Sequence, residues 1–169
     1  MTLDELNVLS PADAEAEFLK CCGSTAWAQK MVEARQFANV ESLLAKGDEI
    51  WWSLSEADWL AAFRAHPKIG ERKAAVAQSN QARNWSAQEQ SGVASASAQT
   101  IDELARRNRE YEERFGFIFI VCASGKSSEE MLSLLAERMS NDPEIELRVA
   151  AEEQRKITRL RVAKLLQHP

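Results

Sequence analysis

Apolar residues recur along this chain at helical spacing, and most of the stretches that carry them open on a residue that can cap a helix. Between residues 55 and 65, Trp59, Leu60 and Phe63 fall on one helical stripe, as in an amphipathic helix with one buried face. A Thr100–Glu103 capping box opens another helix. Cap and proline signals predict helices over residues 11–22, 25–35, 39–51, 55–65, 100–115, 127–139 and 143–166.

Two stretches interrupt the helical pattern. In HPKIG, residues 66–70, Pro67 disfavours helix at the residue before it, so His66 is predicted to lie at a helix end. FGFIFIVCASGKS, residues 115–127, has the composition of a buried strand, but the sequence offers no second strand to pair with it. The backbone groups of such an extended segment need hydrogen-bond partners, and a bound ligand can supply some of them.

Composition favours a helical fold. The chain has 169 residues, of which 45% are apolar, and its 6 glycines and 4 prolines are too few for the many turns of an all-β fold. Its length fits one domain. We therefore predict an all-α fold with roughly seven to nine helices, forming a single compact domain over residues 1–169 with one apolar extended segment that lines the site.

Charge and cysteine content exclude several classes of partner. The 26 acidic residues exceed the 21 basic ones, which argues against nucleic-acid binding. The longest apolar run, FGFIFIVCA, is far shorter than the roughly 20 residues that span a bilayer, and the N-terminal sequence lacks the pattern of a secretory signal. Three cysteines, two of them adjacent, make a poor disulfide framework. We expect reduced, partly buried thiols in a cytoplasmic protein that binds neither nucleic acid nor membrane.

Motifs for cofactors, metals and nucleophiles are absent from the sequence. It contains no GxGxxG, GxxxxGK[ST] or GxSxG. With two histidines and no CxxC or HExxH, it offers no metal-ligand set of recognisable spacing. We therefore expect no bound cofactor and no metal.

Two residues could carry acid–base chemistry. His66 has the side chain most easily poised for proton transfer at neutral pH, although the macrodipole also favours a histidine at a helix C-terminus. Glu89 follows Ser86 by three residues, and local sequence favours a capping box at that pair. A helix N-terminus can also dock an anionic substrate, so both interpretations stay open. Arg161, flanked by apolar positions, could turn inward and would then need an anionic partner.

Four motifs together resemble one enzyme family. AHPKIG, WSAQEQ, NREYEERFGFIFIVCASGKS and EIELRVAAEEQRKITRLRVAKLL occur in the order found in the OHCU decarboxylase family, and the ASGKS ending is similar to its bacterial and plant branch. OHCU is 2-oxo-4-hydroxy-4-carboxy-5-ureidoimidazoline, a product of urate oxidation and 5-hydroxyisourate hydrolysis. The resemblance covers about residues 8–166. It implies an all-α, cofactor-free and commonly homodimeric enzyme of urate degradation, which converts OHCU to (S)-allantoin with loss of carbon dioxide.

The resemblance also implies roles for individual residues. His66 and Glu89 match the family's catalytic pair, with His66 as the acid/base and Glu89 orienting the substrate. Arg161 matches a family arginine that we expect near the substrate carboxylate. Further substrate contacts are implied at Pro67, Ser86 and Gln90 and, through the backbone, at Ile120, Val121, Cys122 and Ala123.

A second class of function remains open on the sequence. A non-catalytic helical interaction module could use the tryptophan-rich region 51–59 as its contact face. This alternative predicts an exposed aromatic patch and binding that is indifferent to His66 and Glu89.

Overall fold

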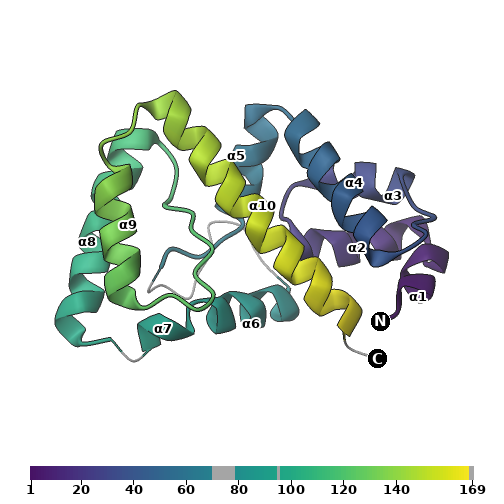
Figure 1. Cartoon of the computed structure of the whole chain (residues 1–169), viewed down its shortest axis with the longest axis horizontal. Helices are drawn as coiled ribbons and strands as arrows, with labels where there is room; N and C mark the ends of the chain where they lie inside the picture. The colour runs from purple at the N-terminus through teal and green to yellow at the C-terminus, as the bar shows by residue number, and fades with distance from the viewer. Residues whose placement is uncertain (70–78, 95, 168–169) are drawn as a thin grey trace. The chain divides into compact units, whose positions relative to one another are not determined.

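The computed structural model describes residues 1–69, 79–94 and 96–167 of the chain (Figure 1). Within those residues it is all-helical and contains no β-strand, which confirms the predicted fold class. The described helices are α1 (Leu3–Val8), α2 (Pro11–Cys21), α3 (Thr25–Glu33), α4 (Val40–Ser53), α5 (Glu56–Arg64), α6 (Asn80–Glu89), α7 (Ser91–Ala94), α8 (Ala98–Phe115), α9 (Ser128–Arg138) and α10 (Pro143–Gln167).

The helices gather into two compact units. The first unit comprises Met1–Ala62 with Arg155–Pro169, and the second comprises Phe63–Gln154. Helices α5 and α10 each contribute residues to both. That the whole chain folds as a single domain stays a prediction.

Four helices begin at or within one residue of their predicted starts. The side chains of Ser10, Ser24, Asn39 and Ser127 each accept a hydrogen bond from the backbone N–H three residues on, at the start of α2, α3, α4 and α9. Such bonds satisfy one of the N–H groups that a helix leaves without a partner in its first turn. Gly116 ends α8 in the left-handed conformation, with φ at 78°, where a β-carbon would be strained.

The predicted start of α8 is wrong. The helix begins at Ala98, because the hydroxyl of Ser97 accepts the hydrogen bond from the N–H of Thr100 at 3.2 Å. Glu103 pairs with Arg106 and Arg107 on the helix surface instead of closing a capping box. Helices α1 and α6 also begin where the sequence predicts no helix.

The buried side chain of Trp27 joins the helices of the first unit. Helices α2, α3 and α4 pack in succession, and the rings of Phe18 and Trp27 meet edge to face at 5.8 Å. The Trp27 indole N–H donates to the carbonyl of Gly47 at 3.0 Å, so the glycine inside α4 leaves room for the ring. Arg155 and Arg159 of α10 both donate to Asp48 of α4, at 2.8 and 2.7 Å.

The second unit has its core between α8, α9 and the segment 117–127 that joins them. The segment appears as a non-helical trace leading from α8 to α9 (Figure 1). Its apolar side chains belong to the same core as those of the helices that pack together on either side of it. The apolar non-helical stretch predicted from the sequence is confirmed, and its buried core neighbours are Ile69, Val93, Leu104, Tyr111, Met131 and Leu135.

Candidate active site

His66 lies just past the end of α5, as predicted. Its backbone N–H donates to the carbonyl of Phe63 at 3.1 Å, which closes the last turn of the chain before Pro67. His66 is buried, with 8% of its surface exposed, and Pro67 is buried beside it. The backbone at His66 is restrained on both sides. Its N–H is bound to the end of α5, and the ring of Pro67 fixes φ at the next residue.

Contacts on either side of His66 fix this stretch within the second unit. The ring of Phe63 packs on Phe117 of the apolar segment, with centroids 5.5 Å apart. Lys68 forms an ion pair with Glu112 of α8, and Ile69 enters the core. Residue 70, the last of the HPKIG motif, lies outside the described residues.

The capping box predicted at Ser86 and Glu89 is wrong. Both residues lie in the last turns of α6, whose N-cap is Ser79. Ala82, Trp85, Ser86 and Glu89 are its buried residues, and their spacing of three and four positions marks one helix face. The helix N-terminus that could have docked an anion is therefore not at Ser86. Two polar side chains instead point to the buried side of α6.

The end of α6 and helix α7 pack against the end of the apolar segment. Gln90, the half-buried C-cap of α6, donates its N–H to the carbonyl of Ser86 at 3.1 Å. Two residues later, Gly92 approaches the carbonyl of Lys126 so closely that a β-carbon on it would lie 2.1 Å from that oxygen. The lack of a side chain at Gly92 lets the two backbones meet there.

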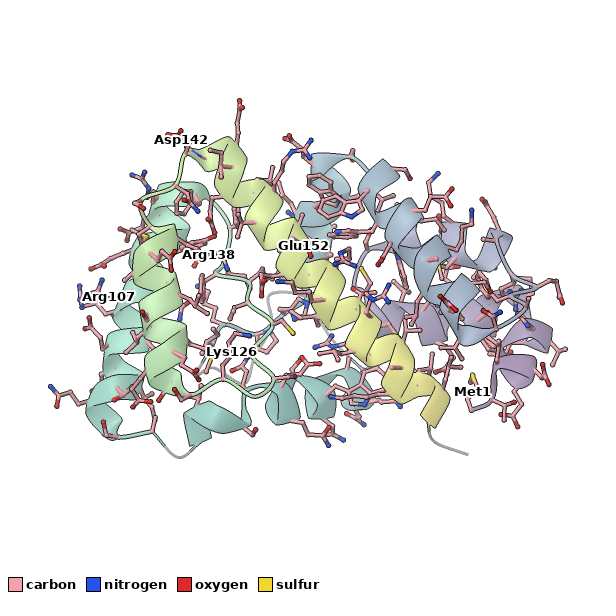
Figure 2. All side chains as sticks on the ribbon, in the orientation of Figure 1. Met1, Arg107, Lys126, Arg138, Asp142 and Glu152 are labelled. Atoms are coloured by element: carbon pink, nitrogen blue, oxygen red, sulfur yellow. The ribbon has the colours of Figure 1, made fainter. Side chains whose placement is uncertain are left out.

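Charged side chains hold the backbone of the apolar segment. The guanidinium of Arg138, on α9, donates to the carbonyl of Ile120 at 2.7 Å. A carboxylate oxygen of Glu153, on α10, accepts the N–H of Cys122 at 2.7 Å. The ammonium of Lys126 donates to the carbonyl of Cys122, also at 2.7 Å. Figure 2 labels Arg138 on α9 and Lys126 near the end of the segment. These charged partners do what a neighbouring strand would otherwise do.

Arg138 belongs to a buried polar network. Its Nε donates to Glu146 of α10 at 2.7 Å, and its Nη2 donates to the hydroxyl of Tyr111 on α8 at 3.3 Å. The Tyr111 hydroxyl in turn donates to Glu146. The guanidinium also lies over the ring of Phe119, 4.5 Å from its centroid. Burial is the main cause that raises the pKa of Tyr111, so its hydroxyl keeps the proton that it donates.

Sequence reasoning missed this network, although a signal was present. Arg138 follows Met131 and Leu135 at seven and three positions, on the buried stripe of α9. Glu146 likewise precedes the buried Ala150 by one helical turn. A charged residue in register with an apolar stripe has to find a partner inside the protein.

Three charged groups surround Cys122. Burial raises the pKa of its thiol, and the carboxylates of Glu153 and Glu89 raise it further, while the ammonium of Lys126 lowers it. The thiol is therefore neutral at physiological pH. The charge of Glu89, on α6, thus contributes to the electrostatics of a residue of the apolar segment.

The predicted site residues divide between the two units. Arg161 belongs to the first unit, where it is 2% exposed, as expected of an inward-turned arginine. Its charge lowers the pKa of the buried Cys21 and Cys22 thiols, although burial dominates and raises that of Cys22 to about 11. The other predicted residues all lie in the second unit: His66, Pro67, Ser86, Glu89, Gln90, Ile120, Val121, Cys122 and Ala123.

The described residues carry neither a metal cluster nor a membrane span. No group of three or more His, Cys, Asp or Glu side chains among them could hold a metal ion. No helix in the same part of the chain is long and apolar enough to cross a membrane.

Comparison with known proteins identifies the family. The sequence profile of OHCU decarboxylase matches residues 7–163. The chain belongs to the OHCU decarboxylase family. That match includes every residue predicted for the site, from His66 to Arg161.

Relatives within the OHCU decarboxylase family cover most of the chain. It is 43% identical over 152 residues to the uric acid degradation bifunctional protein TTL of Arabidopsis thaliana, a match that covers 89% of this chain and 47% of that protein. The chain thus spans about half the length of this relative. It is also 37% identical over 139 residues to the 2-oxo-4-hydroxy-4-carboxy-5-ureidoimidazoline decarboxylase of Amia calva, covering 80% of this chain and 77% of that one.

A solved structure shares the fold. The crystal structure of an OHCU decarboxylase in the presence of (S)-allantoin matches with a TM-score of 0.78 at 40% sequence identity, over 90% of this chain and 99% of that chain. The helical architecture described above is therefore that of the OHCU decarboxylase family.

Proposed function

We propose that this chain decarboxylates OHCU to (S)-allantoin and carbon dioxide in urate degradation. The observation that carries the proposal is the family match over residues 7–163, a range that contains His66 and Glu89. Both are more than nine-tenths buried in the second unit. Ionisable side chains are seldom so buried without a structural or functional reason.

The chemistry of OHCU accounts for a reaction without a cofactor. The carboxylate leaves from C4, a ring carbon that also bears the hydroxyl and adjoins the C5=N imine. As the C4–carboxylate bond breaks, its electron pair forms a C4=C5 double bond, and the imine π pair moves to nitrogen, which takes a proton. The 4-hydroxyl then loses its proton to give the carbonyl, and C5 gains one to become the stereocentre of allantoin. Because the imine accepts the electrons, no external electron sink is needed.

Each member of the catalytic pair then has a distinct task. His66 exchanges the proton of the 4-hydroxyl or enol oxygen, since an imidazole can both accept and donate a proton near neutral pH. Glu89 accepts hydrogen bonds from ring or ureido N–H groups and so fixes which face of C5 is protonated. Arg161 binds the substrate carboxylate, and the remaining contacts come from Pro67, Ser86, Gln90 and the backbone of residues 120–123.

The stereochemistry of the product tests this function. OHCU also decays spontaneously, and that route gives racemic allantoin. Urate is supplied with the two upstream enzymes, and the circular dichroism of the product is followed with and without this protein. We expect optically active (S)-allantoin when the protein is present. A racemic product at high protein concentration would refute the proposal.

The interaction-module alternative is less well supported. It needs an exposed aromatic patch over residues 51–59, but Trp51 and Trp59 are buried. The indole N–H of Trp59 donates to the carbonyl of Trp51 at 2.9 Å, so the pair is engaged within the first unit. Trp52 is 40% exposed, which is ordinary for a single surface residue.

We further propose that the working form is a homodimer in the cytoplasm. The three cysteines are free and buried, as in proteins of reducing compartments. Sedimentation equilibrium measures the assembly: a mass of one chain at micromolar concentration would contradict the dimer. Fractionation of cells that express a tagged protein tests the location.

A further inference from the structure

Charged side chains form hydrogen bonds with both backbone polar groups of Cys122, a residue of the apolar segment. The N–H of Cys122 donates to Glu153, and its carbonyl accepts from Lys126, each at 2.7 Å. Glu153 lies 31 positions away on α10, whereas Lys126 lies four positions along the same segment. A long-range and a short-range side chain therefore meet at one residue.

The two side chains that bind the Cys122 backbone have opposite charge. Hydrogen bonds in which one partner is ionised are roughly twice as strong as neutral ones, and both hydrogen bonds to the Cys122 backbone are of this kind. Since an ammonium and a carboxylate act on the same residue, their charges largely offset each other at a distance. Two side chains of opposite charge thus hold the backbone of one residue.

Two observations relate Cys122 and Lys126 to helices α6 and α7. The charge of Glu89, on α6, raises the pKa of the Cys122 thiol. The carbonyl of Lys126 is the group against which Gly92 packs. Lys126 thus touches Cys122 with its side chain and Gly92 of α7 with its backbone.

We propose that Glu153 and Lys126 are positioning residues: because they hold both backbone polar groups of Cys122, they fix where the neighbouring residues of the segment contact substrate. The proposal rests on the proposed function, in which residues 120–123 bind OHCU through their backbone. Backbone groups that are preset need no reordering when substrate binds. A displacement of about 1 Å at such a contact can lower the rate about 100-fold.

Four variants separate positioning from other roles. Glu153→Leu removes the acceptor for the Cys122 N–H, and Glu153→Gln keeps an acceptor oxygen without the charge. Lys126→Met removes the donor to the Cys122 carbonyl. Glu113→Gln is the matched control, because Glu113 is exposed on α8. We expect kcat/KM to fall about 10- to 100-fold in Glu153→Leu and Lys126→Met, with substantial rescue in Glu153→Gln and no change in the control.

The pattern of loss distinguishes the possible outcomes. If Glu153→Leu and Lys126→Met keep the kcat and KM of the wild type, the proposal is wrong. It is also wrong if they only lower the thermal midpoint, since a purely structural role would do that. If Glu153→Gln is as impaired as Glu153→Leu, the charge of Glu153 matters rather than its hydrogen bond to Cys122, and Glu153 is not a positioning residue. The double variant Glu153→Leu/Lys126→Met should lose less than the product of the two single losses, because both act on one residue's backbone.

A measurement independent of activity keeps this inference separate from the proposed function. Alkylation of Cys122 by iodoacetamide, followed by mass spectrometry against pH, reports the charges around the thiol. We expect faster alkylation in Glu153→Gln and slower alkylation in Lys126→Met than in the wild type, because the two changes move the thiol pKa in opposite directions. If neither rate changes, the two contacts do not form in solution and the inference fails. If both rates change while the wild-type product is racemic, only the proposed function fails.

Discussion

Gly92 of α7 and Lys126 of the apolar segment touch backbone to backbone: a β-carbon at position 92 would lie 2.1 Å from the Lys126 carbonyl oxygen. Real β-carbons essentially never come so near another atom. The obstructing atom belongs to the main chain, so no side-chain rotation can relieve the clash. This approach fixes how α7, with Glu89 and Gln90 just before it, lies against the segment.

Gly92→Ala should therefore damage both stability and activity. We expect a loss of about 1–3 kcal/mol in the free energy of unfolding, as for other overpacked sites, and a fall in kcat/KM, because Glu89 moves with α6. Urea unfolding and the stereochemical assay measure the two effects. Ser91→Ala, at the exposed neighbouring position, is the control. Wild-type stability in Gly92→Ala would mean that the two backbones do not meet.

Loss of either catalytic side chain should separate chemistry from folding. We expect His66→Ala to lower kcat about 10²- to 10⁴-fold, the usual contribution of a positioned acid or base. Glu89→Gln should reduce the optical purity of the allantoin as well as the rate. Both proteins should keep the far-ultraviolet circular dichroism of the wild type. If His66→Ala still forms (S)-allantoin at a near-normal rate, another residue is the acid/base.

The buried ion pair of Arg138 and Glu146 should be costly to break from one side. Arg138→Met leaves the Glu146 carboxylate buried without its cation, and removal of one partner of such a pair costs about 3–5 kcal/mol. We expect the double variant Arg138→Met/Glu146→Leu to be less destabilised than the sum of the single changes. Urea unfolding of the three variants gives the coupling. The exposed pair of Arg106 and Glu110 is the comparison, and its removal should barely change the midpoint.

Alkaline pH should destabilise the protein through Cys22. Burial raises the pKa of this thiol from 9.0 to about 11 in the folded chain. Between those values the unfolded chain has lost the proton and the folded chain has kept it, so stability falls as pH rises. The difference amounts to about 1 kcal/mol at pH 10.

The Cys22→Ala variant isolates this contribution. Its unfolding free energy should fall less steeply between pH 8 and pH 10.5 than that of the wild type, whatever its absolute stability. Comparison of slopes rather than values removes the effect of lost packing. Equal slopes would show that the Cys22 thiol titrates normally in the folded protein.

Local sequence predicted the fold well where the determining interaction is itself local. Ser10, Ser24, Asn39 and Ser127 cap helices because each side chain reaches an N–H only three residues away. The same spacing misled at Ser86 and Glu89, because a serine followed three residues later by glutamate also fits one face of a helix interior. Helix α6 was missed because, apart from Trp85 and two alanines, its residues are polar.

The candidate site was predictable in part. The motif around His66 is continuous in sequence, and Pro67 alone is enough to place a helix end there. The partners of the apolar segment are not continuous with it: Arg138 and Glu153 lie 18 and 31 positions away from the groups that they bind. The register of Arg138 with the apolar stripe of α9 indicated that it turns inward, but no local feature of Arg138 or Glu153 indicated which backbone group it would bind.

The side-chain hydrogen bonds to the backbone of Ile120 and Cys122 fix the length of the apolar segment between α8 and α9. Most joints between helices accept added or deleted residues, because their backbone is solvated and free to bulge outward. Here Arg138, Glu153 and Lys126 each recognise one peptide group by its position. An extra residue anywhere from 120 to 126 would present the wrong group to at least one of them. Insertions should therefore be tolerated elsewhere on the surface long before they are tolerated between α8 and α9.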